Sequence, residues 1–230
     1  MERTNTGVKN LSNVIAYALI GAIAFVIMKF EFPILPGIGF LKFDFSDVVI
    51  TIGTFIFGPG PGAFIAFIRM LLGLIFSGFA LPSLVGQLAA FVATLSFAFP
   101  FYFIAQSVSQ ENRKTLKGHL LPIVGLIIGI LAMTVILALT NAFILTPVYA
   151  VTSMANVPHI GSYAALYNFT VHDYLGALLH LPSMSAYIFG IIVPFNLIKG
   201  AINAVVVYIL FEAVLKSIRP FVRKKFNLAR

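Results

Sequence analysis

Apolar residues run through the chain in long stretches that short polar or Gly/Pro-containing segments separate. No Asp, Glu, Lys or Arg occurs from Met70 to Gln110, or from Gly118 to His172. A helix of about 20 apolar residues crosses a bilayer, so each uncharged stretch is long enough for one or two spanning helices. We therefore predict six membrane helices, at residues 12–30, 46–57, 63–76, 84–106, 119–145 and 186–218.

Prolines and glycines predict where these helices end. The loop at 31–40 holds two prolines and two glycines, which disfavour regular helix. Gly58-Pro59-Gly60-Pro61-Gly62 is expected to leave the second helix with about 12 residues, roughly 18 Å, too short to cross a bilayer unaided. Thr146-Pro147 is expected to end the fifth helix. In the connection that follows, residues 163–179 are predicted to form a short helix in the membrane interface.

Composition and charge support a membrane protein. Hydrophobic residues make up 60% of the chain, charged residues 10%, and the mean hydropathy is +1.03, far from the balance of a soluble domain. Eleven of the fifteen Lys and Arg residues lie at the N-terminus, in 113–117 and in 216–230. By the positive-inside rule, both termini and the 107–118 loop are cytoplasmic. The net charge of +8 is then a topology signal rather than a nucleic-acid surface.

These patterns predict one all-α domain over residues 1–230, an integral membrane bundle of six transmembrane helices. Its most informative polar residues are Asn196 and Lys199, which share one helix face inside the last apolar run. A lysine at membrane depth costs several kcal/mol unless it is paired or functional. Lys199 either contacts a ligand or neutralises an acidic residue, and Asp44 or Asp47 is then its best partner.

Other polar residues in the apolar runs give weaker signals. The amide of Asn141 either forms hydrogen bonds with an imide-like ligand edge together with Asn196 or joins two helices by a hydrogen bond. Arg69 is predicted to extend towards a membrane interface. Ala18 and Ala22 form a small-xxx-small pattern, which suits either internal packing or a close contact with another helix.

Enzyme chemistry finds little support in the sequence. The chain has no Cys, and its four histidines show no metal-ligand spacing. We find no Ser-His-acid set, no phosphate-binding glycine loop and no carboxylate pair on one helix. We therefore expect neither an enzyme nor a bound metal or cofactor.

Several motifs together resemble the substrate-binding S-components of energy-coupling factor (ECF) transporters, most closely the riboflavin-specific branch. The resemblance covers the whole chain. Its most specific parts are Phe43-Asp44-Phe45-Ser46-Asp47 and Asn196-x-x-Lys199, supported by residues 40–42, 57–62 and 141–149.

The resemblance implies a six-helix subunit of the prokaryotic plasma membrane that captures riboflavin, as substrate rather than cofactor, from outside. Ala18 and Ala22 would contact a transmembrane coupling subunit, which carries two cytoplasmic ATPases. The implied ligand contacts are Phe40, Leu41 and Lys42 in the first outer loop, Asp44 beside them, and Asn141, Asn196 and Lys199 in the helices.

Three alternatives remain open from the sequence. The chain can be an S-component for another vitamin, a membrane assembly protein without a small-molecule ligand, or a small membrane enzyme that acts on lipids. The first predicts flavin binding that is indifferent to Asn141, Asn196 and Lys199. The second predicts that Lys199 serves only as a member of an ion pair.

Overall fold

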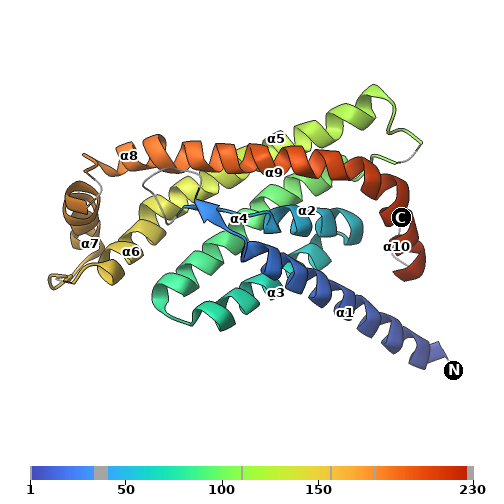
Figure 1. The fold of residues 1–230 in the computed structure, drawn as a ribbon, viewed down its shortest axis with the longest axis horizontal. Coiled ribbons are helices and arrows are strands. Elements are labelled where there is room, and N and C mark those ends of the chain that lie inside the picture. Colours follow the sequence, from blue (N-terminus) through green and yellow to red (C-terminus); the bar gives the residue numbers. More distant parts are fainter. Residues whose placement is uncertain (1, 34–40, 110, 156, 179, 227–230) are drawn as a thin grey trace.

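The structure, a computed structural model, describes residues 2–33, 41–109, 111–155, 157–178 and 180–226. It is built almost wholly of helices (Figure 1). Its first half contains α1 (Glu2–Met28), a hairpin of β1 (Phe32–Pro33) and β2 (Lys42–Phe43), α2 (Ser46–Phe57), α3 (Pro59–Ser77) and α4 (Leu81–Ala105).

The second half consists of two long helical rods joined by a short helix. The first rod is α5 (Leu116–Thr140), the π-helical segment η1 (Asn141–Leu145) and α6 (Thr146–Ser153); the joining helix is α7 (Tyr163–Phe169) with η2 (Thr170–Leu178). The second rod is α8 (Met184–Tyr187), η3 (Ile188–Ile192), α9 (Val193–Ala213), η4 (Val214–Ile218) and α10 (Arg219–Phe226).

Five helices in the described residues are long and apolar enough to cross a membrane. They cover Leu11–Met28, Pro59–Ser77, Leu81–Ala105, Leu116–Ser153 and Met184–Ala213. α2 has only 12 residues and does not reach this length, so the count of six crossings stays a prediction. The start of α1, the turn between α4 and α5, and α10 lie at the same end of the molecule (Figure 1).

α2 lies inside the bundle rather than on its surface. It packs against α1, α3, α4 and α9, and most of its side chains are buried. Phe55 of α2 meets Phe101 of α4 and Phe211 of α9 at ring-centroid distances of 5.6 and 4.9 Å. A helix that is apolar on all sides is stable only when other helices surround it. This arrangement places the start of α2 in the middle of the protein.

The expected break at Gly58–Gly62 is confined to one residue. Gly58 has a φ of 102°, a conformation that favours glycine, and α3 begins at the next residue. Pro59 and Pro61 lie in the first turn of α3, where a missing N–H costs nothing. The predicted start of this helix at residue 63 is therefore four residues late.

The expected end of the fifth helix at Thr146-Pro147 is wrong. The π-helical segment η1 comes directly before this pair, and the helix continues through α6 to Ser153. The same order recurs where η3 precedes Val193-Pro194 and η4 precedes Arg219-Pro220. Proline cannot donate the backbone hydrogen bond of a regular helix, and a π turn before it accommodates that loss without a break.

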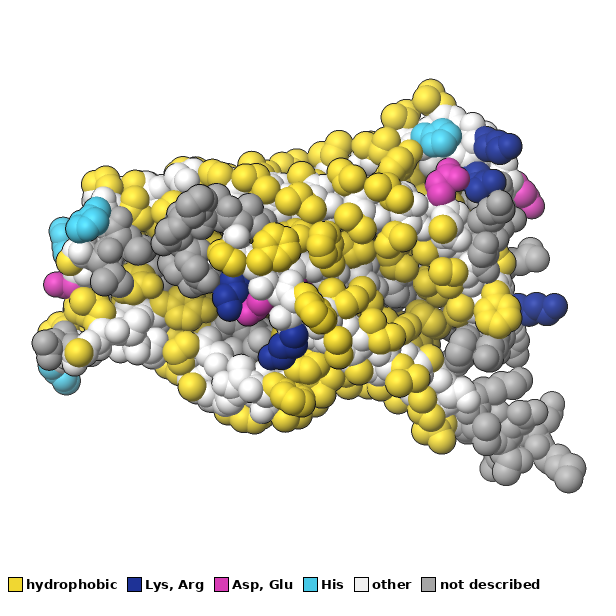
Figure 2. Space-filling view, viewed as in Figure 1, with side chains coloured by type: hydrophobic (Ala, Val, Ile, Leu, Met, Phe, Trp, Pro, Cys, Tyr) yellow, Lys and Arg dark blue, Asp and Glu magenta, His cyan; other side chains and the backbone are white. Residues whose placement is uncertain are grey.

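Hydrophobic side chains cover most of the surface shown in Figure 2, as expected of a protein surrounded by lipid. On α1 the most exposed ones recur every three or four residues and form one stripe. The stripe consists of Leu11, Ile15, Leu19, Ile23 and Val26.

Candidate functional site

The candidate site begins where the hairpin runs into α2. Phe32 pairs with Phe43 and Pro33 with Lys42 across the two strands, so the loop predicted to be irregular contains a short antiparallel ladder. The Asp44 carboxylate accepts a 2.7 Å hydrogen bond from the backbone N–H of Ser46, the first residue of α2. This bond satisfies one of the free N–H groups at the helix start.

Asp47, in the first turn of α2, is the centre of a buried polar cluster. Its Oδ2 lies 3.1 Å from the Lys199 ammonium of α9, and its Oδ1 lies 3.4 Å from the Arg69 guanidinium of α3. The Thr94 hydroxyl of α4 donates to the same Oδ1 at 2.5 Å. Four helices therefore meet at one carboxylate, whose side chain is only 2% exposed.

Arg69 adds two more hydrogen bonds to this cluster. Its NH1 donates to the Ser46 hydroxyl at 2.9 Å, and its NH2 donates to the Thr94 hydroxyl at 3.0 Å. The prediction that Arg69 extends towards a membrane interface is wrong, because the residue is 1% exposed. A guanidinium in an apolar bundle is stabilised by a carboxylate and hydroxyls arranged around its planar fork.

The prediction that Lys199 pairs with Asp44 or Asp47 is correct for Asp47. Glu212, which lies farther along α9, pairs with Arg113 at 3.2 Å. The Lys199 ammonium has three N–H donors. Only one of them can point at Asp47, so the other two are available to a ligand.

A cavity of about 490 Å³ opens beside this cluster. Its volume lies within the range of small-molecule sites, about 300–1,000 Å³. The lining includes two lysines, an arginine, two acids, an amide and a phenol, which together offer donors and acceptors. These residues are Lys42, Lys199, Arg69, Glu31, Asp44, Gln87 and Tyr149.

The two predicted amides are buried but do not line this cavity. Asn141 in η1 donates from its Nδ2 to Leu137 O at 2.8 Å, and Asn196 in α9 donates to Ile192 O at the same distance. The Asn196 Oδ1 is buried without a hydrogen-bond partner. Because an unpaired buried acceptor is costly, this atom is available for a ligand donor.

Of the four contacts predicted in and beside the first outer loop, the structure places two on the wall of the cavity. Lys42 and Asp44 line it, whereas Leu41 is half-buried against the apolar cluster of α6, η2 and α8. Phe40 lies outside the described residues. Phe43 is buried between Phe32 and Phe45, at ring-centroid distances of 5.4 and 4.8 Å.

Sequence reasoning missed Thr94, Gln87 and Tyr149. Thr94 and Gln87 lie on α4 in a long run without charge, and Tyr149 lies beyond the proline that was expected to end its helix. The signal for Gln87 was its rarity, since it is a lone amide in the first half of an apolar helix. Thr94 gave no such signal, because threonines in membrane helices usually bond to their own backbone.

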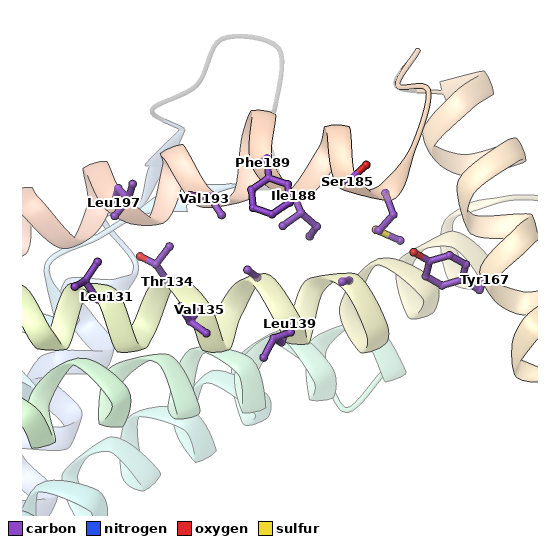
Figure 3. Close-up of a pocket in the computed structure, with 13 residues that line it drawn as sticks. Leu131, Thr134, Val135, Leu139, Tyr167, Ser185, Ile188, Phe189, Val193 and Leu197 are labelled. Carbon is purple, nitrogen blue, oxygen red and sulfur yellow. The ribbon is translucent and has the colours of Figure 1, made fainter.

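A second cavity of about 570 Å³ lies between α5–η1 and α8–η3–α9 (Figure 3). Leu131, Val135 and Leu139 form one wall and Phe189, Val193 and Leu197 the other. Its lining has no charged side chain and no amide among the described residues; Thr134, Tyr167 and Ser185 provide only hydroxyls. This groove suits an apolar occupant and offers little to a ligand rich in polar groups.

Ala18 and Ala22 are half-buried on α1, at the border of its exposed stripe. The neighbouring Gly21 faces inward, because a Cβ there would lie 2.7 Å from the Cβ of Ile68 on α3. Gly21 therefore serves the packing of α1 against α3. Ala18 and Ala22 instead lie where a further helix can approach.

Comparisons with known proteins agree with this architecture. Residues 12–211 match the family model "ECF transporter, substrate-specific component". The chain is 30% identical to the riboflavin transporter RibU of Staphylococcus aureus (strain TCH60), over 91% of this chain and 94% of that protein. It is 28% identical to the riboflavin transporter FmnP of Bacillus subtilis (strain 168), over 94% and 96%.

A solved structure described as "Structure and mechanism of the S component of a bacterial ECF transporter" has a similar fold. The TM-score is 0.62 at 29% sequence identity, and the match covers 89% of this chain and 96% of that one. The similarity thus extends over nearly the full length of both chains.

Proposed function

Because the chain belongs to the family of ECF transporter substrate-specific components, we propose that it is the riboflavin-binding membrane subunit of such a transporter. It is a transport protein rather than an enzyme. The observation that carries the proposal is the Lys199 ammonium, which Asp47 holds beside a cavity of ligand size. An intramembrane cation that is paired and still faces a cavity is typical of a substrate pathway.

The chemistry of riboflavin suits this cavity. The vitamin has an apolar tricyclic plane, an imide-like edge with donors and acceptors, and a hydroxylated chain. Lys199 would donate a hydrogen bond to a neutral acceptor of the edge, and the unpaired Oδ1 of Asn196 would accept a hydrogen bond from an N–H of the same edge. Asp44, Gln87 and other polar groups of the lining would serve the hydroxylated chain.

The remaining contacts belong to the same proposal. Lys42 and Leu41, with Phe40 before them, would cover the ligand from the first loop. Asn141 would contribute a second amide from the η1 side. Support comes from the position of Lys42 on the cavity wall and from the burial of Asn141 at a π-helical segment, a feature frequent at functional sites.

Orientation and partners follow from charge and from the surface of α1. The start of α1, α10 and the α4–α5 turn would face the cytoplasm, where the positive-inside rule puts basic segments. The cavity would then open to the outside of the cell membrane. Ala18 and Ala22 would contact a transmembrane coupling subunit, and two ATPases bound to that subunit would supply the energy.

A titration of the purified protein with riboflavin tests this function. Detergent-solubilised protein should be yellow or should quench riboflavin fluorescence saturably. Lys199→Met should weaken binding by about 10- to 100-fold, since a hydrogen bond to a charged group contributes about 1.5–3 kcal/mol. Lys117→Met, at an exposed position of α5, is the matched control and should bind like the wild type.

The outcome separates the alternatives. Colourless protein that is indifferent to riboflavin would reject this substrate, and the same assay would then be run with other vitamins. Flavin binding that Lys199→Met and Asn196→Ala leave intact would favour the alternative of an S-component for another vitamin.

A further inference from the structure

Asp47 is buried behind the cavity, and the cations that it contacts line the cavity. Of the described residues, Lys199 and Arg69 belong to the cavity lining and Asp47 does not. Its two carboxylate oxygens have different partners. Oδ1 faces the Thr94 hydroxyl and Arg69, whereas the one partner that the described part of the chain offers to Oδ2 is the Lys199 ammonium.

This division of contacts indicates what the carboxylate does. A lysine side chain has a flexible four-carbon stem and pays rotamer entropy wherever it is fixed. Thr94 and Arg69 come from α4 and α3 and fix one oxygen of Asp47. The other oxygen then presents a fixed anion to Lys199, which keeps the ammonium at one place on the cavity wall.

We propose that Asp47 is a positioning residue for ligand recognition: it does not contact the ligand, but it orients Lys199, and Thr94 in turn orients Asp47. The inference rests on the proposed function, because it assigns to Lys199 a contact with the flavin. It predicts that Asp47 and Thr94 affect binding only while Lys199 is present.

A double-mutant cycle on riboflavin binding measures that dependence. Asp47→Asn should weaken binding by about tenfold or more, as the loss of one charge-assisted hydrogen bond does. In a Lys199→Met background the same change should cost less than about twofold, because no ammonium is left to orient. Equal losses in both backgrounds would overturn the proposal and make Asp47 a structural residue only.

Thr94 supplies a second cycle that avoids removing a buried charge. Thr94→Val keeps the shape and removes the hydroxyl, and should weaken riboflavin binding by about threefold in the wild type and not in Lys199→Met. Thr94→Ser should restore binding. The control is Thr140→Val on α5, whose hydroxyl donates at 2.7 Å to the Ile136 carbonyl of its own helix. An effect of Thr140→Val equal to that of Thr94→Val would contradict the inference.

A measurement without ligand separates this inference from the proposed function. Acetic anhydride modifies unprotonated lysines, and mass spectrometry reports the rate at each position. Asp47→Asn should raise the rate at Lys199 severalfold relative to the exposed Lys117, because the carboxylate that stabilises the protonated, unreactive ammonium is gone. If the wild type fails to bind riboflavin but this rate rises, the function is wrong and the orientation of Lys199 by Asp47 stands. An unchanged rate would refute the positioning role whatever the ligand.

Discussion

Glu31 and Lys42 are joined by an ion pair of 2.6 Å that links the two arms of the β1–β2 hairpin at the rim of the polar cavity. Both side chains are more than a third exposed, so the pair adds little to the stability of the fold. Because both side chains also line the polar cavity, the pair joins the two arms of the hairpin beside any ligand bound there.

We expect Lys42→Met to speed riboflavin release by about two- to fivefold, which corresponds to the 0.5–1 kcal/mol of an exposed pair. The melting temperature should fall by at most about 4 °C, since 1 kcal/mol shifts the melting temperature of a chain of this size by about 2–4 °C. Stopped-flow fluorescence measures the release. The charge-swapped protein, Glu31→Lys with Lys42→Glu, should recover slow release; if it does not, Lys42 contacts the ligand directly.

Asn196 and Asn203 form a matched pair on one face of α9. Both are nearly fully buried, and each has an Oδ1 without a hydrogen-bond partner. Asn196 is one turn from Lys199, whereas Asn203 is one turn beyond it in the direction away from the first loop. Asn196→Leu should weaken riboflavin binding by about tenfold or more, and Asn203→Leu should leave it unchanged. Equal weakening by both variants, measured by fluorescence titration, would contradict the assignment of Asn196 to the ligand.

Counting charges in the buried cluster predicts an order of stabilities. Arg69→Met or Lys199→Met leaves one cation with the Asp47 carboxylate, whereas Asp47→Asn leaves two buried cations without their shared anion. Asp47→Asn should therefore lower the free energy of unfolding most, by about 3–5 kcal/mol. Glu212→Gln, which breaks an exposed pair with Arg113, should cost at most about 1 kcal/mol. Denaturation in mixed micelles measures the free energy of unfolding of each variant. If Arg69→Met lowers it more than Asp47→Asn does, the order predicted from the charges is wrong.

α1 provides a test that separates folding from assembly. Gly21→Leu should destabilise the isolated protein by about 1–3 kcal/mol, because its side chain would meet Ile68 of α3. Ala18→Leu and Ala22→Leu should leave thermal stability and riboflavin binding of the isolated protein unchanged. They should reduce its co-purification with the coupling subunit, since larger side chains prevent the close approach of two helices. Co-purification unaffected by both alanine variants would exclude this face as the contact.

The sequence predicted the class of the fold well because lipid imposes a strong rule on composition. Long uncharged runs gave the helices of the bundle, and the short length of α2 was correct to within about a residue. The short helix at 163–179 was also predicted, and the structure has α7 and η2 there, up to Leu178; its position in the membrane interface stays a prediction. One failure occurred at Pro147, where local propensity suggested a break and the helix continues through α6. At Pro59 the expected break is real, but it is confined to Gly58 and α3 begins four residues earlier than predicted.

The candidate site could be predicted only in part. Lys199 and its acidic partner could be predicted from the sequence, since a charge in an apolar run needs an explanation. Arg69 carried the same signal and was misplaced, because its neighbours in sequence do not reveal that α2 and α4 surround it with Ser46, Asp47 and Thr94. Membership of a cluster formed by four helices is a property of packing, not of any one segment.

The π-helical segments before Pro147, Pro194 and Pro220 affect how this chain can be aligned with its relatives. A π turn holds one more residue than the α turn it replaces, so every side chain after it is rotated relative to the ideal helical wheel. A relative without the corresponding proline would then need a one-residue gap within the membrane segment. Equivalent residues on α6 and α9 should therefore be matched by superposition rather than by counting along an unbroken helix.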